Sequence, residues 1–193
     1  KMAIESAQKL TQRIDGKKIV EKFAAQLENT CGKKIKVEID DEIPTAAKIE
    51  FAENYNRNYH LVKYKSSYPA FEHLVIHELI HLELASEARE VEENQLFITN
   101  QSYKSKFFHT LEKFAEDLHK KGIAEKNIAN YLQALFDGIN RQVYNTPIDL
   151  FIEDRIYNRF PKLRPFQFLS LFAMMQEGIQ ATTKPEIVKN TPK

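Results

Sequence analysis

Cysteine is almost absent from this chain of 193 residues, in which Cys31 is the single example. An intrachain disulfide bond is therefore excluded, which agrees with a reducing compartment. A zinc site built from cysteine thiolates is excluded as well. Any metal ion that the chain binds must be held by histidine, aspartate or glutamate side chains.

Long apolar segments are also missing. No run approaches the ~18 apolar residues that a bilayer-spanning helix needs, and residues 1–5 lack the apolar core of a signal peptide. We therefore expect no membrane partner and a cytoplasmic location. Because the chain begins with Lys1 rather than Met, earlier removal of a signal peptide stays open, and with it a secreted or periplasmic location.

An excess of charge of either sign is missing too. The 28 Lys and Arg residues nearly balance the 27 Asp and Glu residues, and the formal net charge is +1. Without a basic stripe or a stacking motif, we expect no nucleic-acid partner. The length suits one domain with a sizeable core, so we predict a single domain over residues 1–183 and a polar tail or linker over residues 184–193.

The order of the predicted elements indicates an α+β domain. Residues 2–29 predict helix, interrupted near Gly16, with Asp15 as the N-cap of its second part. Alternating or β-prone segments predict three strands, at 34–40, 47–52 and 59–64. The rest predicts helices at 69–85, 87–98, 101–121, 124–144, 146–159 and 164–181. Strands followed by helices favour a small antiparallel sheet packed on a mostly helical domain.

One motif carries chemistry. His77-Glu78-Leu79-Ile80-His81 matches the pattern H-E-x-x-H. Residues four apart lie on one face of a helix, so His77 and His81 can reach one ion. Zn²⁺ accepts imidazole nitrogens readily, and it makes a nearby water more acidic. Glu78 is placed to take a proton from that water. We therefore predict a zinc site with Glu78 as general base.

A catalytic zinc site needs a third protein ligand, and no H-E-x-x-H-x-x-G-x-x-H extension supplies one here. We predict Glu153, on the apolar helix 146–159, as this ligand. Asp149, which shares its face, or Asp154 would then orient a ligand histidine. The alternative is that Glu153 forms an ion pair with Arg155 or Arg159 on a solvated face.

Other histidines and acids are weaker candidates. His73 lies one turn before His77, where a core or substrate-contacting role is favoured over a ligand role. The acids that follow the motif helix could serve as ligands if that segment folds back, and two later histidines lie on another helix. For these two acids and two histidines we favour an exposed surface position over a ligand role; the four residues are Glu92, Glu93, His109 and His119.

These residues resemble the gluzincin branch of the zincin metallopeptidases, over about residues 45–160. The resemblance implies that His77, His81 and Glu153 bind zinc and that Glu78 is the base. It also implies a strand beside the site, 47–52 or 59–64, that pairs with an extended peptide substrate. An Asn-Glu-x-x-Ser-Asp segment of the thermolysin kind is missing around Glu153, so no subfamily is assigned.

The resemblance further implies a side chain that assists the transition-state oxyanion. We predict Tyr157, which is four residues after Glu153, with Tyr144 as the second candidate. Core packing with the hydroxyl at the rim is the alternative role for both.

The function predicted from these residues is hydrolysis of peptide bonds in a peptide or protein substrate. The alternatives are a catalytically silent zincin-fold module that binds metal as a sensor or interaction partner, and a helical interaction domain without metal. Glu78 favours the enzyme, because a structural site needs no general base. His and carboxylate ligands also suit iron, cobalt or nickel.

Overall fold

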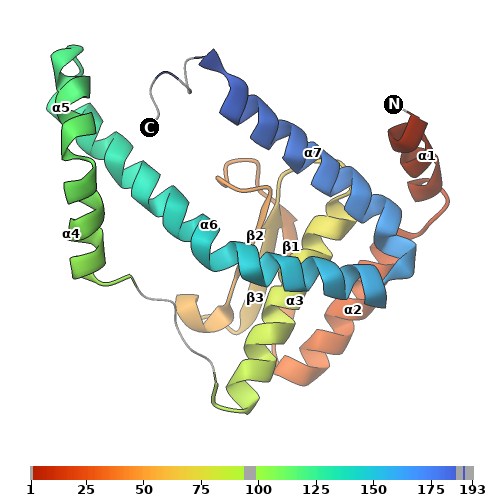
Figure 1. Ribbon diagram of the computed structural model, residues 1–193. Helices are drawn as coiled ribbons and strands as arrows, with labels where there is room; N and C mark the ends of the chain where they lie inside the picture. The colour runs from red at the N-terminus through yellow and green to blue at the C-terminus, as the bar shows by residue number, and fades with distance from the viewer. Residues whose placement is uncertain (1, 94–98, 186–188, 190–193) are drawn as a thin grey trace. The chain divides into compact units, whose positions relative to one another are not determined.

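The computed structural model describes residues 2–93, 99–185 and 189. Its contacts divide the chain into two compact units (Figure 1). Unit 1 comprises Lys1–Asn94 and Phe151–Thr182, and unit 2 comprises Gln95–Leu150 and Thr183–Lys193. The single domain predicted over residues 1–183 stays a prediction. Part of the predicted tail over 184–193 lies outside the described residues.

The sheet of unit 1 has three strands, β1 (Lys34–Ile39), β2 (Ala47–Glu50) and β3 (Tyr59–Tyr64), in the order β1-β3-β2. All three lie where strands were predicted, and the α+β class is confirmed. The antiparallel prediction is wrong for one pair: β2 runs antiparallel to β3, but β1 pairs with β3 in parallel. A short 3-10 helix, η1 (Ala52–Tyr55), joins β2 to β3, whereas the connection after β1 crosses to the far side of β3.

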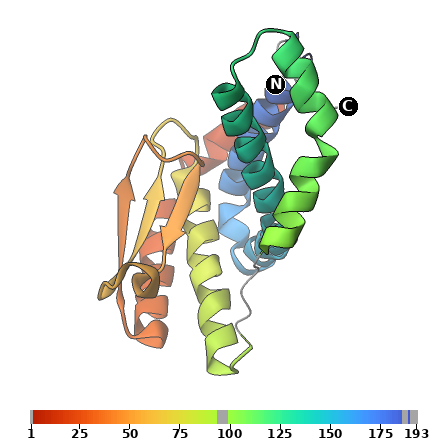
Figure 2. The ribbon, with the colours of Figure 1, turned by 90° about the vertical axis from the view of Figure 1, so that its left-hand side faces the viewer.

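Two helices cover one face of this sheet (Figure 2). Helix α2 (Gly16–Cys31) begins where predicted, because the Asp15 carboxylate accepts the Lys18 amide at 3.0 Å. Helix α3 (Phe71–Glu90) lies beside α2 and contacts β2 and β3. Most of α3 between His73 and Leu82 is buried, so this helix forms the centre of the unit 1 core.

The remaining helices of unit 1 are α1 (Met2–Thr11), the last part of α6 (Glu125–Arg159) and α7 (Arg164–Thr183), with the 3-10 helix η2 (Pro161–Leu163) between the last two. The start of α7 packs tightly on α2. A Cβ at Gly16 would lie 2.9 Å from the Phe166 ring and 3.0 Å from Glu72 Cγ, so only glycine fits there.

Helix α6 is continuous, whereas the sequence predicted two helices, at 124–144 and 146–159. Pro147 lies inside the helix. Proline removes one amide donor and crowds the carbonyl four residues earlier. Pro147 and Val143 are both exposed, so water can satisfy that carbonyl and the helix can continue.

Unit 2 contains α4 (Gln101–Thr110), α5 (Glu112–Lys120) and the first part of α6. Its buried cluster is Leu118, Ile128 and Leu132. The predicted helix 101–121 is divided at Leu111, and Gly122, which follows the C-cap of α5, has a positive φ of 81°. Across residues 2–93, 99–185 and 189, none of the helices combines the length and the apolarity needed to cross a bilayer.

Candidate metal centre

Three histidines line one face of α3. His73, His77 and His81 are each four residues apart, and neighbouring ring centroids lie 6.3 Å and 5.0 Å apart. His73 is only 1% exposed, whereas the His77 side chain is 17% exposed and His81 is also half-buried. The helix therefore holds a row of imidazoles whose first member is in the core and whose other members approach the surface.

Glu153 reaches this row from α6. Its Oε1 lies 2.8 Å from Nδ1 of His77, and its Oε2 lies 2.9 Å from Nε2 of His73. A carboxylate only accepts hydrogen bonds, so the histidine nitrogens that face it carry the protons. In a neutral His77 ring, the proton on Nδ1 leaves the lone pair on Nε2. Nε2 is then the nitrogen through which His77 would bind a metal ion.

Gln167 of α7 completes the surroundings of Glu153. Its Nε2 donates to Glu153 Oε2 at 2.6 Å and to the Glu153 carbonyl oxygen at 2.9 Å. Burial on its own raises the pKa of Glu153, but hydrogen bonds from His73, His77 and Gln167 outweigh it and hold the pKa well below its usual range. Glu153 is therefore an anion at neutral pH. No local signal in the sequence pointed to Gln167, a polar residue in an apolar helix.

The predicted ligands are only partly brought together in the described residues. Ligand atoms of His73, His77 and Glu153 all lie within 4.8 Å of one another, so the group that includes Glu153 contains His73 rather than His81. The core role favoured for His73 agrees with its burial, but its contact with Glu153 was not foreseen. Nδ1 of His73 is buried without a hydrogen-bond partner among the residues that the structure describes.

Two arginines near Glu153 are engaged elsewhere. Arg159 donates to both oxygens of Glu83 at 2.7 Å and 2.8 Å, and Arg155 donates to Glu83 at 3.0 Å and to Glu87. The alternative in which Glu153 pairs with these arginines is therefore not observed. Instead, the ion pairs of these arginines join α6 to α3. The first of their acceptors on α3, Glu83, is two residues after His81.

The other metal-ligand candidates lie on the surface. Glu92 and Glu93 are both exposed beyond the end of α3. His109 is exposed and pairs with Glu112 at 2.9 Å, and His119 is exposed on α5. The surface position favoured for these four residues is confirmed.

The two tyrosines considered for the oxyanion lie in different units. Tyr157 belongs to unit 1 and is 51% exposed, with the Arg164 guanidinium 4.0 Å above its ring. Tyr144 belongs to unit 2, where its hydroxyl lies 3.0 Å from the Thr99 hydroxyl. The catalytic role of Tyr157 stays a prediction, and its exposure leaves room for a substrate contact.

The sheet order distinguishes the two strands considered for peptide pairing. β3 lies between β1 and β2, so both of its edges are occupied. β2 forms an edge of the sheet, and α3 packs against it. Of the two strands, β2 is the one with an open edge for an extended peptide.

Comparison with known proteins gives no match: no family model, no curated protein and no solved structure matches this chain. The resemblance to the gluzincins therefore rests on the residues of the motif and on Glu153.

Proposed function

We propose that this protein is a zinc-dependent peptidase in which His77 and His81 hold the ion and Glu78 is the general base. The observation that carries the proposal is the 2.8 Å contact between Glu153 Oε1 and Nδ1 of His77. A carboxylate on the far nitrogen, here the half-buried Glu153, is the partner that histidine ligands of metal ions usually have. A coincidental H-E-x-x-H sequence on a helix would not require one.

The donor set suits zinc. It consists of imidazole nitrogens and carboxylates, without thiolates, and a zinc ion of this kind supplies a Lewis acid that polarises a carbonyl and acidifies water. The orphaned Nδ1 of His73 is a buried polar atom at the inner end of the same row. Its position supports the view that the row is built for polar chemistry rather than for packing.

Each side chain would have a separate role in hydrolysis. Glu153 holds His77 in one tautomer and one orientation. Glu78, next to His77 and half-buried, takes a proton from the attacking water and later gives it to the leaving amine. The edge of β2 aligns an extended peptide by backbone hydrogen bonds.

The identity of the third ligand belongs to the same proposal. Glu153 is the predicted ligand, but in the described arrangement both of its oxygens accept hydrogen bonds. Its role as a ligand is therefore tested separately from its role in orienting His77.

Glu78→Gln tests the enzymatic part. We expect this variant to bind zinc as the wild type does and to lose hydrolysis of a quenched-fluorescent peptide library by about 10²–10⁴-fold, because the amide cannot accept the proton. The exposed Glu87→Gln on the same helix is the matched control and should keep full activity. If wild type and Glu78→Gln bind zinc but neither cleaves any peptide, the protein is a metal-binding module rather than a peptidase.

A further inference from the structure

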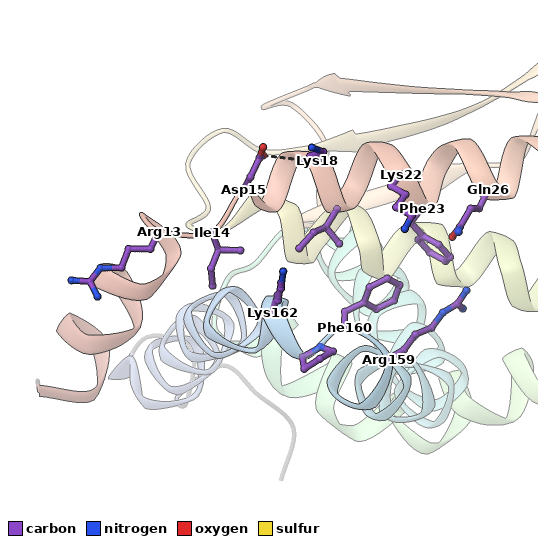
Figure 3. Close-up of a pocket in the computed structure, with 12 residues that line it drawn as sticks. Arg13, Ile14, Asp15, Lys18, Lys22, Phe23, Gln26, Arg159, Phe160 and Lys162 are labelled. Atoms are coloured by element: carbon purple, nitrogen blue, oxygen red, sulfur yellow. Dashed lines mark hydrogen bonds between the residues drawn. The ribbon is translucent and has the colours of Figure 1, made fainter.

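A second site lies in unit 1, away from the histidine row. A pocket of about 800 Å³ opens between α2 and the segment that joins α6 to α7 (Figure 3). The volume is in the range of small-molecule sites, roughly 300–1,000 Å³. Its apolar walls include Ile19 and Phe23 from α2 and Phe160 and Pro161 from the opposite side.

The polar part of the lining is strongly basic. Five of the lining side chains are cationic and one is a carboxylate, in a chain whose net charge is only +1. The carboxylate belongs to Asp15, and it is already used as the N-cap of α2. Figure 3 shows Lys22 pointing from α2, and Lys162 from the opposite side, toward the space between them. The positive potential is therefore local to this pocket.

Most of these cations have no ion-pair partner among the residues that the structure describes. Arg159 is the exception, because it pairs with Glu83 and stacks on the Phe23 ring at 4.8 Å. Within the described ranges, Arg13, Lys22 and Lys162 form no ion pair. Cations that converge over aromatic walls without carboxylate partners suit a ligand that brings its own negative charge.

We propose that this pocket binds a small soluble organic anion, in which a carboxylate, phosphate or sulfonate group is joined to an aromatic or alkyl part. The acidic group lies between Lys22 and Lys162, and the apolar part lies against the half-buried Ile19 and Phe160. Neither half of the pocket is sufficient: exposed lysines alone attract ions weakly, and the apolar walls alone would not select for charge. The site is independent of the proposed zinc chemistry.

Two fluorescent probes with the same aromatic frame test this inference. 8-Anilinonaphthalene-1-sulfonate carries a sulfonate, and N-phenyl-1-naphthylamine is its neutral counterpart. With the full chain, we expect saturable binding of the sulfonate probe, weakened by salt, and weaker binding of the neutral probe. The double variant Lys22→Gln with Lys162→Gln should bind the sulfonate probe about tenfold more weakly, at roughly 0.7 kcal/mol per lost charge contact.

The matched control removes the same amount of charge elsewhere. Lys17 is on α2 outside the pocket, and Lys126 is exposed on α6, so Lys17→Gln with Lys126→Gln should bind the sulfonate probe as the wild type does. Circular dichroism checks that each variant is folded. The inference is overturned if the Lys22 and Lys162 double variant keeps wild-type affinity, or if the neutral probe binds as tightly as the sulfonate.

Discussion

At the scale of single residues, Glu153 connects three helices. It accepts hydrogen bonds from His73 and His77 of α3 and from Gln167 of α7, while it is itself part of α6. A carboxylate with this many donors stays ionised and fixed in place. The state of His77 in the motif therefore depends on a residue 76 positions away in the sequence.

Glu153→Ala should weaken zinc binding by about 10–100-fold, as losses of groups that orient ligands usually do. Glu153→Gln separates the two possible roles. An amide oxygen can still accept the His77 proton, so a purely orienting residue would keep most of the affinity, whereas a ligand would lose as much as in Glu153→Ala. Competition with a chromophoric chelator measures both constants.

A neighbour on α6 completes that test. Asp154 is exposed and bonded to Asn158, so Asp154→Ala is the control and should leave affinity unchanged. If Glu153→Gln keeps affinity, Glu153 orients His77 and is not itself a ligand. Wild-type affinity in Glu153→Ala would contradict both roles of Glu153.

At the scale of elements, ion pairs join α3 to α6. Glu83, whose side chain is only 13% exposed, takes charged hydrogen bonds from Arg155 and Arg159. Glu83→Ala leaves both guanidinium groups without this acceptor and should lower the free energy of unfolding by about 1–2 kcal/mol. Urea denaturation measures the change.

An exposed ion pair is the control for that prediction. Glu21 pairs with Lys17 at 3.9 Å, and both side chains are more than half exposed. Glu21→Ala should change the free energy of unfolding by less than about 0.5 kcal/mol. Equal effects of Glu83→Ala and Glu21→Ala would mean that the contacts of Glu83 do not stabilise the pairing of α3 with α6.

Glu53, in the 3-10 helix η1, makes the free energy of unfolding depend on pH. Burial raises the pKa of Glu53, but the hydrogen bond from Lys33 at 2.6 Å and the charge of Arg89 outweigh it and lower the pKa from 4.5 to about 2. Between these values the unfolded chain takes up a proton that the folded chain does not. The contribution of Glu53 is therefore complete above pH 4.5 and is lost as pH falls toward 2.

Urea midpoints measured between pH 2 and pH 7 test this dependence. Glu53→Gln should be less stable than the wild type at pH 7, and the difference should shrink as pH falls through the window. Glu38→Gln, at an exposed position on β1, is the control. A constant difference between Glu53→Gln and the wild type at every pH would contradict the assigned pKa.

Local patterns predicted the elements better than their partners. The alternation in 34–40 and the β-prone run in 59–64 were enough to predict strands, because side-chain alternation is a local property. The parallel pairing of β1 with β3 depends on how the chain crosses between strands, which no local pattern records. The predicted break between 144 and 146 was wrong for the opposite reason. The local preference of Pro147 for a helix start was overridden by the surrounding helix.

In the site, too, local features could be predicted and contacts between distant segments could not. The spacing of His77 and His81 on one helix face follows from helix geometry, so it could be predicted. Glu153 lies against His77, but its role in the site stays a prediction. Its contact with His73 and its bond from Gln167 depend on the packing of α3, α6 and α7. Such contacts arise only when distant segments meet.

At the scale of the whole molecule, a nearly neutral net charge conceals local charge. The formal net charge of +1 excludes a strong electrostatic field over the whole molecule. Locally, however, the charges are uneven, with a basic pocket beside α2 and an acidic residue at the histidine row. Composition therefore limits which large partners are attracted, whereas small ligands respond to the arrangement of charges within one unit.

The central claim is that the histidine row binds one zinc ion, and metal content measures it most directly. Elemental analysis of the purified protein, offered zinc at neutral pH and then dialysed, should find about one zinc per chain. His77→Ala should lose that zinc, while the exposed control His119→Ala should keep it. A wild-type protein that retains no zinc, or a His77→Ala variant that retains as much as the wild type, would contradict the account.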